Sequence, residues 1–172
     1  MNLTKEQIDI FNGLLLSDAH LTKVKNNQNS RMVFGVKYRS FLEKIIDILP
    51  LSWSNIIEKD ALDKRTNNIY HRCSLKSHVN PFITRQRNAW YLNDKKIVLN
   101  DLDITSTTLM WWYLGDGSLC KKKSRPNYRR ICFATDSFTK EENQSLISKL
   151  KSLLQDDNLY LESNKIYISR SA

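Results

Sequence analysis

Glycine is scarce in this chain, and the few glycines are concentrated in two places. The 172 residues include only four glycines, and no segment is of low complexity. Three of them, Gly13, Gly115 and Gly117, fall within two apolar stretches, at residues 11–21 and 109–119. Glycine inside a helix costs about 1 kcal/mol relative to alanine. Two helices that approach backbone to backbone would give these glycines a reason to be there.

Cysteine is also scarce. Cys73, Cys120 and Cys132 are odd in number and show no C-x-x-C spacing. A disulfide framework or a zinc site is therefore not expected from the sequence, and a reducing compartment is favoured.

Long apolar runs are missing. No run reaches 18 residues, the length typical of a membrane-spanning helix. The first residues, 1–7, lack the apolar core of a signal peptide. We therefore expect no membrane partner and no secretion. The richness in Asn, Lys and Ile favours an AT-rich genome, as in a mitochondrion, a chloroplast or a phage, but leaves the location open.

Acidic residues are outnumbered by basic ones. The 27 Lys and Arg residues exceed the 18 Asp and Glu residues, which gives a net charge of +9 and a pI near 9.5. Such a charge favours a polyanionic partner, most simply a nucleic acid. A soluble protein that is merely basic is the alternative reading.

The two apolar stretches share one pattern. Each has the length of a helix and ends in a small residue, an aspartate (Asp18 or Asp116) and another small residue. If the two helices pair, both aspartates arrive at helix C-termini. The helix dipole disfavours negative charge there, so a cation between the carboxylates would stabilise them.

This pattern resembles the LAGLIDADG homing endonucleases, in particular the monomeric type with two motif copies in one chain. Residues 13–19 resemble the first copy and residues 112–118 the second. The resemblance implies an α+β fold. Its two pseudo-symmetric halves would pack through the motif helices, and their antiparallel sheets would form a DNA-binding saddle.

The order of expected elements repeats along the chain. The first half would hold a helix at 4–17, strands at 19–25 and 31–38, a helix at 40–49, strands at 53–58 and 69–76 around a loop at 59–68, and a helix at 78–91. The second would hold a helix from Thr105, strands at 119–123 and 129–135 around a turn at 124–128, a helix opened by a capping box at Thr139, and strands at 159–162 and 165–169. The second half lacks a counterpart of the last helix of the first half. We place the first half at 1–92, the linker at 93–103 and the second half at 104–172.

The resemblance also implies a metal-dependent reaction. Asp18 and Asp116 would each bind Mg²⁺, or Mn²⁺ in its place, together with the main-chain carbonyls of Ser17 and Gly115. Carboxylates and carbonyls are the oxygen ligands that Mg²⁺ prefers. Lys96 matches a linker lysine that lies near the scissile phosphate in the family. A solvated linker lysine is the alternative.

Recognition of DNA is expected from outward-facing strand residues, because a two-stranded ribbon fits the major groove. The candidates are Lys23, Lys25, Arg31, Lys37, Tyr70, Arg72, Lys76, Lys121, Lys122, Lys123 and Arg130. The assignment of faces rests on period-2 alternation, which a single bulge reverses.

We therefore expect a monomeric, site-specific double-strand DNA endonuclease with a long target site. A non-cleaving binder on the same fold is the alternative, either a maturase that acts on host intron RNA or a DNA-binding regulator. An inactive remnant is the third reading.

Overall fold

The computed structural model describes residues 2–25, 28–64, 66–122 and 125–169. The chain folds into two compact units. One comprises Met1–Ile8 and Asp18–Ala89, and the other Asp9–Ser17 and Trp90–Ala172. The first helix, α1 (Lys5–Leu16), therefore contributes to both units.

Helix α1 begins at the expected capping box. Gln7 N donates to Thr4 Oγ1 at 3.2 Å, and Thr4 N donates to Gln7 Oε1 at 3.0 Å. These two bonds satisfy amide groups that the first turn leaves without helical partners. The Gln7 side chain also donates to Ile48 O, which ties the start of α1 to the end of α2 (Arg39–Ile48).

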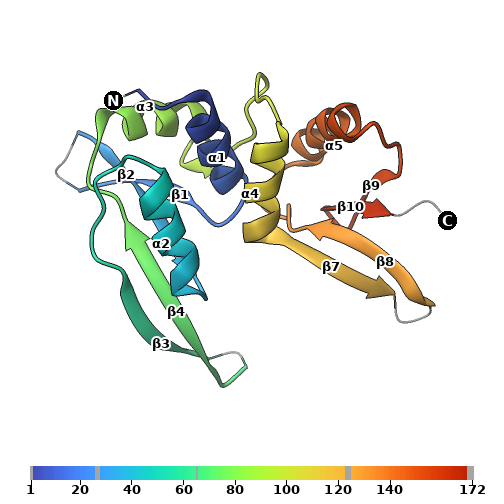
Figure 1. Cartoon of the computed structure of the whole chain (residues 1–172), viewed down its shortest axis with the longest axis horizontal. Coiled ribbons are helices and arrows are strands. Elements are labelled where there is room, and N and C mark those ends of the chain that lie inside the picture. Colours follow the sequence, from blue (N-terminus) through green and yellow to red (C-terminus); the bar gives the residue numbers. More distant parts are fainter. Residues whose placement is uncertain (1, 26–27, 65, 123–124, 170–172) are drawn as a thin grey trace. The chain divides into compact units, whose positions relative to one another are not determined.

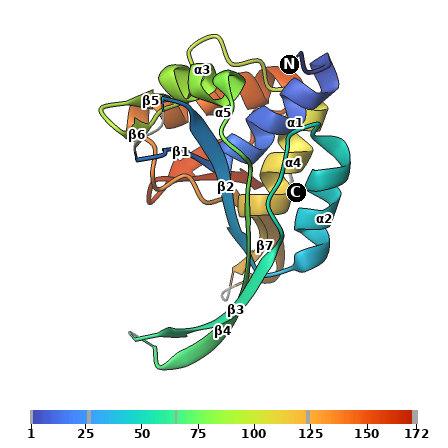
Figure 2. The same cartoon turned by 90° about the vertical axis from the view of Figure 1, so that its left-hand side faces the viewer.

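The first unit contains a four-stranded antiparallel sheet with the order β1-β2-β4-β3. Its elements are β1 (His20–Lys23), β2 (Ser30–Val36), α2, β3 (Ile57–Asp63), β4 (Asn68–Lys76) and α3 (Pro81–Trp90). Helix α2 packs on β2 and β4, where Met32, Phe34 and Leu75 are buried. Figure 1 shows α2 over the sheet, and Figure 2 shows the β3–β4 hairpin extending away from the rest of this unit.

The second unit repeats this topology. Its four-stranded antiparallel sheet has the order β7-β8-β10-β9, which matches that of the first sheet. Its elements are α4 (Ser106–Asp116), β7 (Gly117–Lys122), β8 (Arg125–Phe133), α5 (Lys140–Leu154), β9 (Leu159–Glu162) and β10 (Lys165–Ser169). The predicted α+β fold with two antiparallel sheets is confirmed, and β10 is the last described element.

Helix starts in the second unit follow the sequence signals. Thr105 caps α4 by accepting from Thr108 N. Thr139 and Glu142 form the expected capping box of α5. The linker also packs here, because Val98 N donates to Glu142 and Lys149 donates to Asn100 O.

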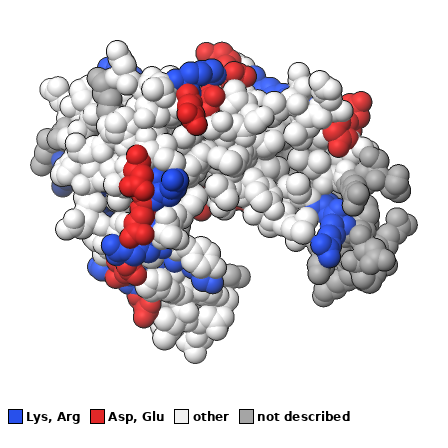
Figure 3. All heavy atoms as spheres, in the orientation of Figure 1, with Lys and Arg blue, Asp and Glu red and all other residues white. Residues whose placement is uncertain are grey.

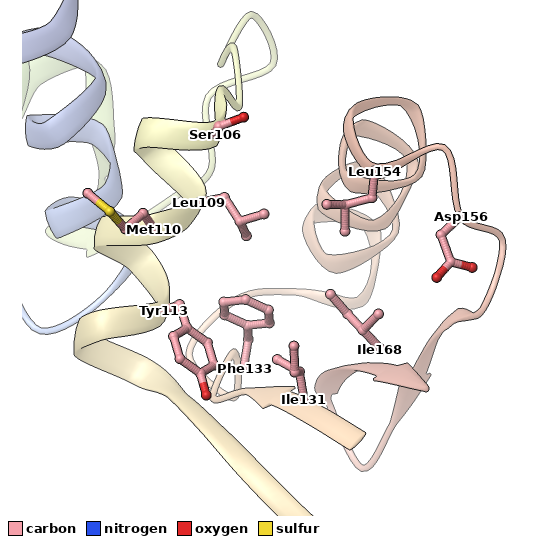
Figure 4. Close-up of a pocket in the computed structure, with 9 residues that line it drawn as sticks. All are labelled: Ser106, Leu109, Met110, Tyr113, Ile131, Phe133, Leu154, Asp156 and Ile168. Carbon is pink, nitrogen blue, oxygen red and sulfur yellow. The ribbon is translucent and has the colours of Figure 1, made fainter. Parts of the chain in front are cut away.

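An apolar pocket of about 520 Å³ lies in the second unit. Figure 4 shows its lining from α4, the sheet and the end of α5: Ser106, Leu109, Met110, Tyr113, Ile131, Phe133, Leu154, Asp156 and Ile168. Met110 remains 52% exposed. Part of the pocket lining is therefore exposed to solvent.

Several predicted boundaries are wrong. The strand expected at 53–58 is β3 at Ile57–Asp63, and Trp53 forms only an isolated bridge with Ser77. The expected 59–68 loop is largely the β3–β4 ladder, since polar residues in an exposed hairpin give no burial signal. Strand β8 begins at Arg125 and includes Pro126, where a turn was expected. A short hairpin of β5 (Tyr91–Leu92) and β6 (Lys95–Lys96), which was not predicted, spans the boundary between the predicted first half and the linker.

No helix in the described part of the chain combines the length and the apolar character needed to cross a membrane.

Candidate metal and nucleic-acid site

The two motif helices pack closely in the second unit. A Cβ atom added to Gly13 of α1 would lie 2.5 Å from the Thr108 carbonyl oxygen and 2.8 Å from Trp111 Cβ of α4. Both distances are shorter than van der Waals contact allows, so only glycine fits. Asp9 of α1 supports the same pair by accepting from Thr105 Oγ1 at 3.0 Å. The glycine placement seen in the sequence is thus explained at Gly13 by close approach of the helix backbones.

The first candidate metal ligand, Asp18, lies just beyond α1. The helix ends at Leu16, and Asp18 is exposed in the turn that leads into β1. The preceding residue, Ser17, is buried and donates through Oγ to Gly13 O and Leu14 O. These bonds fix the turn that presents the Asp18 carboxylate.

The second candidate ligand, Asp116, is the last residue of α4. Its side chain is half-buried, and its main-chain carbonyl accepts from Ala134 N at 3.2 Å. The carboxylate is therefore held at the C-terminus of a helix, where the dipole disfavours its charge and favours a cation.

Lys96 lies at the end of α1. Its ammonium group donates to Leu15 O at 2.6 Å and to Ser17 O at 2.9 Å. A cation is favourable there because the last carbonyls of a helix lack helical partners. The Ser17 carbonyl, a predicted metal ligand, thus already has a positive charge beside it.

The donor atoms at each candidate aspartate suit a hard divalent ion. The Asp18 and Asp116 carboxylates and the Ser17 carbonyl offer only oxygen, the donor that Mg²⁺ prefers. Magnesium keeps several of its waters and needs few protein ligands. The aspartates belong to different units, Asp18 to the first and Asp116 to the second.

The candidate DNA contacts of the first unit fall mostly on one sheet face. Strand pairing places Val33 opposite Lys76 and Gly35 opposite Ser74, on the face away from buried Met32 and Phe34. This open face also carries Arg31, Tyr70 and Arg72. Arg72 lies flat against Gly35, because a Cβ atom at Gly35 would meet its guanidinium group.

Three candidates differ from the predicted pattern. Lys23 pairs with Ser30, so it lies on the same face as Leu21 and Met32, and its assignment to the open face is wrong. Lys25 and Lys37 lie outside the strands, in a turn and a bend. Lys59 lies opposite Arg72 on the open face. It was not predicted as a candidate, because the sequence of its strand indicated a loop.

Arg130 is the best-defined candidate of the second sheet. It donates to Tyr160 Oη at 2.8 Å, pairs with Glu162, and lies 3.7 Å from the centre of the Tyr167 ring. Its pKa is raised by the hydrogen bonds to Tyr160 and Glu162. The side chains of Lys121 and Lys122 are not described, and Lys123 lies outside the described residues.

Comparison with known proteins places this fold in a family. The sequence matches the LAGLIDADG DNA endonuclease family over residues 8–166, so the chain belongs to it. Solved structures include the homing endonuclease I-WcaI bound to its DNA recognition sequence, which has a TM-score of 0.85 and 22% identity. The match covers 98% of this chain and 77% of that one, and it supports the same fold.

Curated relatives include proteins of several kinds. Uncharacterized protein MJ1098 of Methanocaldococcus jannaschii is 32% identical over 88% of this chain and 58% of its own length. Cytochrome b mRNA maturase bI2 of Debaryomyces hansenii is 26% identical over 86% of this chain and 56% of its own. Probable intron-encoded endonuclease 1 of Wickerhamomyces canadensis is 25% identical over 86% and 65%. The chain therefore spans about 56–65% of the length of these relatives.

Proposed function

We propose that this chain is a site-specific double-strand DNA endonuclease that requires Mg²⁺ and accepts Mn²⁺. The observation that carries the proposal is the tight helix pair at Gly13, with an aspartate at or just past the end of each helix. A protein that only binds a polyanion gains nothing from two carboxylates facing it. Membership of the endonuclease family supports the same reading.

In this proposal, Asp18 and Asp116 each hold a divalent ion at one of the two scissile phosphates, with the carbonyls of Ser17 and Gly115. The bound ion would neutralise phosphate charge and lower the pKa of a bound water. Lys96 places a further positive charge at the end of α1. We assign the two halves to residues 1–92 and 104–172, and we expect the protein to act as a monomer.

The proposed DNA contacts of the first unit are made by the open face. Arg31, Arg72, Lys76 and the newly found Lys59 bring positive charge to it, and Tyr70 adds an aromatic side chain. Each of these side chains is long enough to reach a phosphate or a base edge from a strand in the major groove. A net charge of +9 predicts that binding weakens steeply with salt.

A second candidate function is RNA maturation. It is favoured by the similarity to a protein named as a cytochrome b mRNA maturase. The same basic face could bind RNA, but the paired aspartates would then have no chemical task. Cleavage therefore stays the first proposal.

Selection for cleavage from a randomised duplex library tests the function and finds the target. The library would be incubated with protein and Mg²⁺, or with protein and EDTA, and the cut ends would be sequenced. Cuts at one long site that require Mg²⁺ would support the proposal. Binding without cutting would contradict it and favour the maturase or a regulator.

A further inference from the structure

Four side chains that the sequence left unconnected meet on the β3–β4 hairpin. The strand register places Glu58 opposite Cys73 and Asp60 opposite His71. Cys73 is fully buried on the face covered by α2, so the cluster lies on the side of the sheet away from the proposed DNA contacts. Figure 3 shows acidic and basic side chains interleaved over α2 and this hairpin.

Three donor atoms of the cluster point at one another. His71 Nε2 lies 3.1 Å from Glu58 Oε2 and 3.6 Å from Cys73 Sγ, and all three ligand atoms lie within 4.8 Å of one another. In a tetrahedral zinc site, bond lengths of about 2.0 Å to nitrogen or oxygen and about 2.3 Å to sulfur give edges of roughly 3.3 Å for N···O and 3.6 Å for N···S. The observed N···S distance matches, and the N···O distance is slightly short.

The neighbours of the cluster hold these ligands in place. Asp60 Oδ1 lies 3.0 Å from His71 Nδ1, so a proton on Nδ1 leaves the Nε2 lone pair facing Glu58 and Cys73. Such a carboxylate partner is typical of a metal-bound histidine. Arg39 donates to Glu58 Oε1 at 2.6 Å and leaves Oε2 for the cluster, while Glu43 accepts from the same guanidinium group.

We propose that Glu58, His71 and Cys73 form a Zn²⁺ site, with Asp60 orienting His71. Nitrogen, sulfur and carboxylate donors together favour zinc over the hard ion Mg²⁺. Three protein ligands leave the fourth position to water. The linear spacing of the cysteines predicts no zinc site, because the donors are brought together only by the pairing of β3 with β4.

A bound metal ion would cross-link β3 and β4 near the base of the hairpin. Strand β3 is an edge strand that pairs only with β4, and beyond the cluster Leu62 and Ile69 are 56% and 72% exposed. The outer hairpin therefore has little hydrophobic packing to hold it. Tyr70 and Arg72 lie on the other face of β4. The metal cross-link would therefore also hold these proposed DNA contacts in place. That last role rests on the proposed function, whereas the metal site does not.

Titration of the reduced, metal-free protein with Co²⁺ tests the site without any activity measurement. A thiolate ligand gives a sulfur-to-cobalt charge-transfer band that carboxylates alone do not produce. We expect this band to reach its full intensity at one equivalent of Co²⁺ and to be absent in Cys73→Ser. We expect His71→Ala to bind Co²⁺ at least ~10-fold more weakly. Added Zn²⁺ should displace the Co²⁺. The matched controls Cys120→Ser and His78→Ala should keep the band, and Asp18→Asn should keep it as well.

Two outcomes would overturn the proposal. Absence of the band in the folded wild-type protein would show that the cluster is only an ion-pair network around His71. Loss of the band in Cys120→Ser with retention in Cys73→Ser would place the thiolate elsewhere. Circular dichroism of each variant shows whether it is folded. Glu58→Gln keeps His71 and Cys73 as ligands, so we expect it to retain the band but to bind Co²⁺ more weakly.

Discussion

Gly13 is a residue whose replacement is restricted by the backbone of a second helix. In an unconstrained helix, Gly13→Ala would gain about 1 kcal/mol. Here the added methyl group meets the Thr108 backbone at 2.5 Å, so we expect a loss of about 1–3 kcal/mol in the free energy of unfolding. Denaturant unfolding measures the change.

The neighbouring substitution Asn12→Ala is the matched control for Gly13→Ala. Asn12 lies on the same helix and is only half-buried. It should change the unfolding midpoint little. A Gly13→Ala protein as stable as the wild type would contradict the close helix approach.

Lys96 is expected to stabilise the end of α1. Replacement by Met keeps the aliphatic stem but removes the charge that caps Leu15 O and Ser17 O. We expect a loss of about 1 kcal/mol in unfolding free energy and slower DNA cleavage. The exposed neighbour Lys95 provides the control, because Lys95→Met should leave the unfolding free energy and the cleavage rate unchanged. Equal effects of the two substitutions would contradict a specific role of Lys96 at the end of α1.

Tyr167 is expected to titrate late. Burial, followed by its hydrogen bond with Cys132, raises its pKa to about 12, compared with about 10 in an unfolded chain. The raised pKa contributes stability that is complete below pH ~10 and is lost as the pH rises through about 12. In an ultraviolet alkaline titration, Tyr167→Phe should remove one tyrosine that ionises at about pH 12. Loss of a tyrosine that ionises at about pH 10 instead would contradict this assignment.

The β3–β4 strand pair carries most of the DNA contacts that we propose for the first unit. Arg72 is fixed over Gly35 on the open face, so Arg72→Ala should weaken DNA binding by about 1–3 kcal/mol. Fluorescence anisotropy at fixed salt measures this loss. Arg85→Ala removes the same charge from an exposed position on α3 and should have a much smaller effect on DNA binding. Comparable losses in the two variants would indicate only non-specific electrostatic attraction to DNA.

Element order could be predicted from the sequence because apolar periodicity and capping residues mark it locally. Thr4, Thr105 and Thr139 open helices where expected, and the β9–β10 bounds agree with the prediction. The β3–β4 hairpin could not be delimited, because its outer half is exposed on both faces and shows no alternation in burial. The face of Lys23 was misjudged because only the register with β2 determines it.

The candidate site was predictable only in part. The aspartates stand out through a repeated motif, and Lys96 stands out through the family resemblance. The cluster of Glu58, His71 and Cys73 could not be predicted, since Glu58 lies 13 residues before His71 and only the pairing of β3 with β4 brings it to His71 and Cys73. Local sequence thus indicates elements, while contacts across strands require the fold.

At the scale of the whole molecule, two units repeat one topology in a single chain. The sheet orders β1-β2-β4-β3 and β7-β8-β10-β9 correspond strand by strand. Each unit contributes one candidate aspartate, as expected if a duplicated fold cuts the two strands of a duplex. The central claim is therefore that both aspartates are needed for cleavage.

The most direct measurement of that claim is the single-turnover cleavage rate of the selected duplex in Mg²⁺ for the wild type, Asp18→Asn, Asp116→Asn and the exposed control Asp101→Asn. We predict that either motif substitution slows double-strand cleavage at least ~100-fold, about 2.7 kcal/mol in the barrier, with DNA affinity kept, and that Asp101→Asn cuts normally. A wild-type rate of double-strand cleavage in either motif variant would contradict this claim.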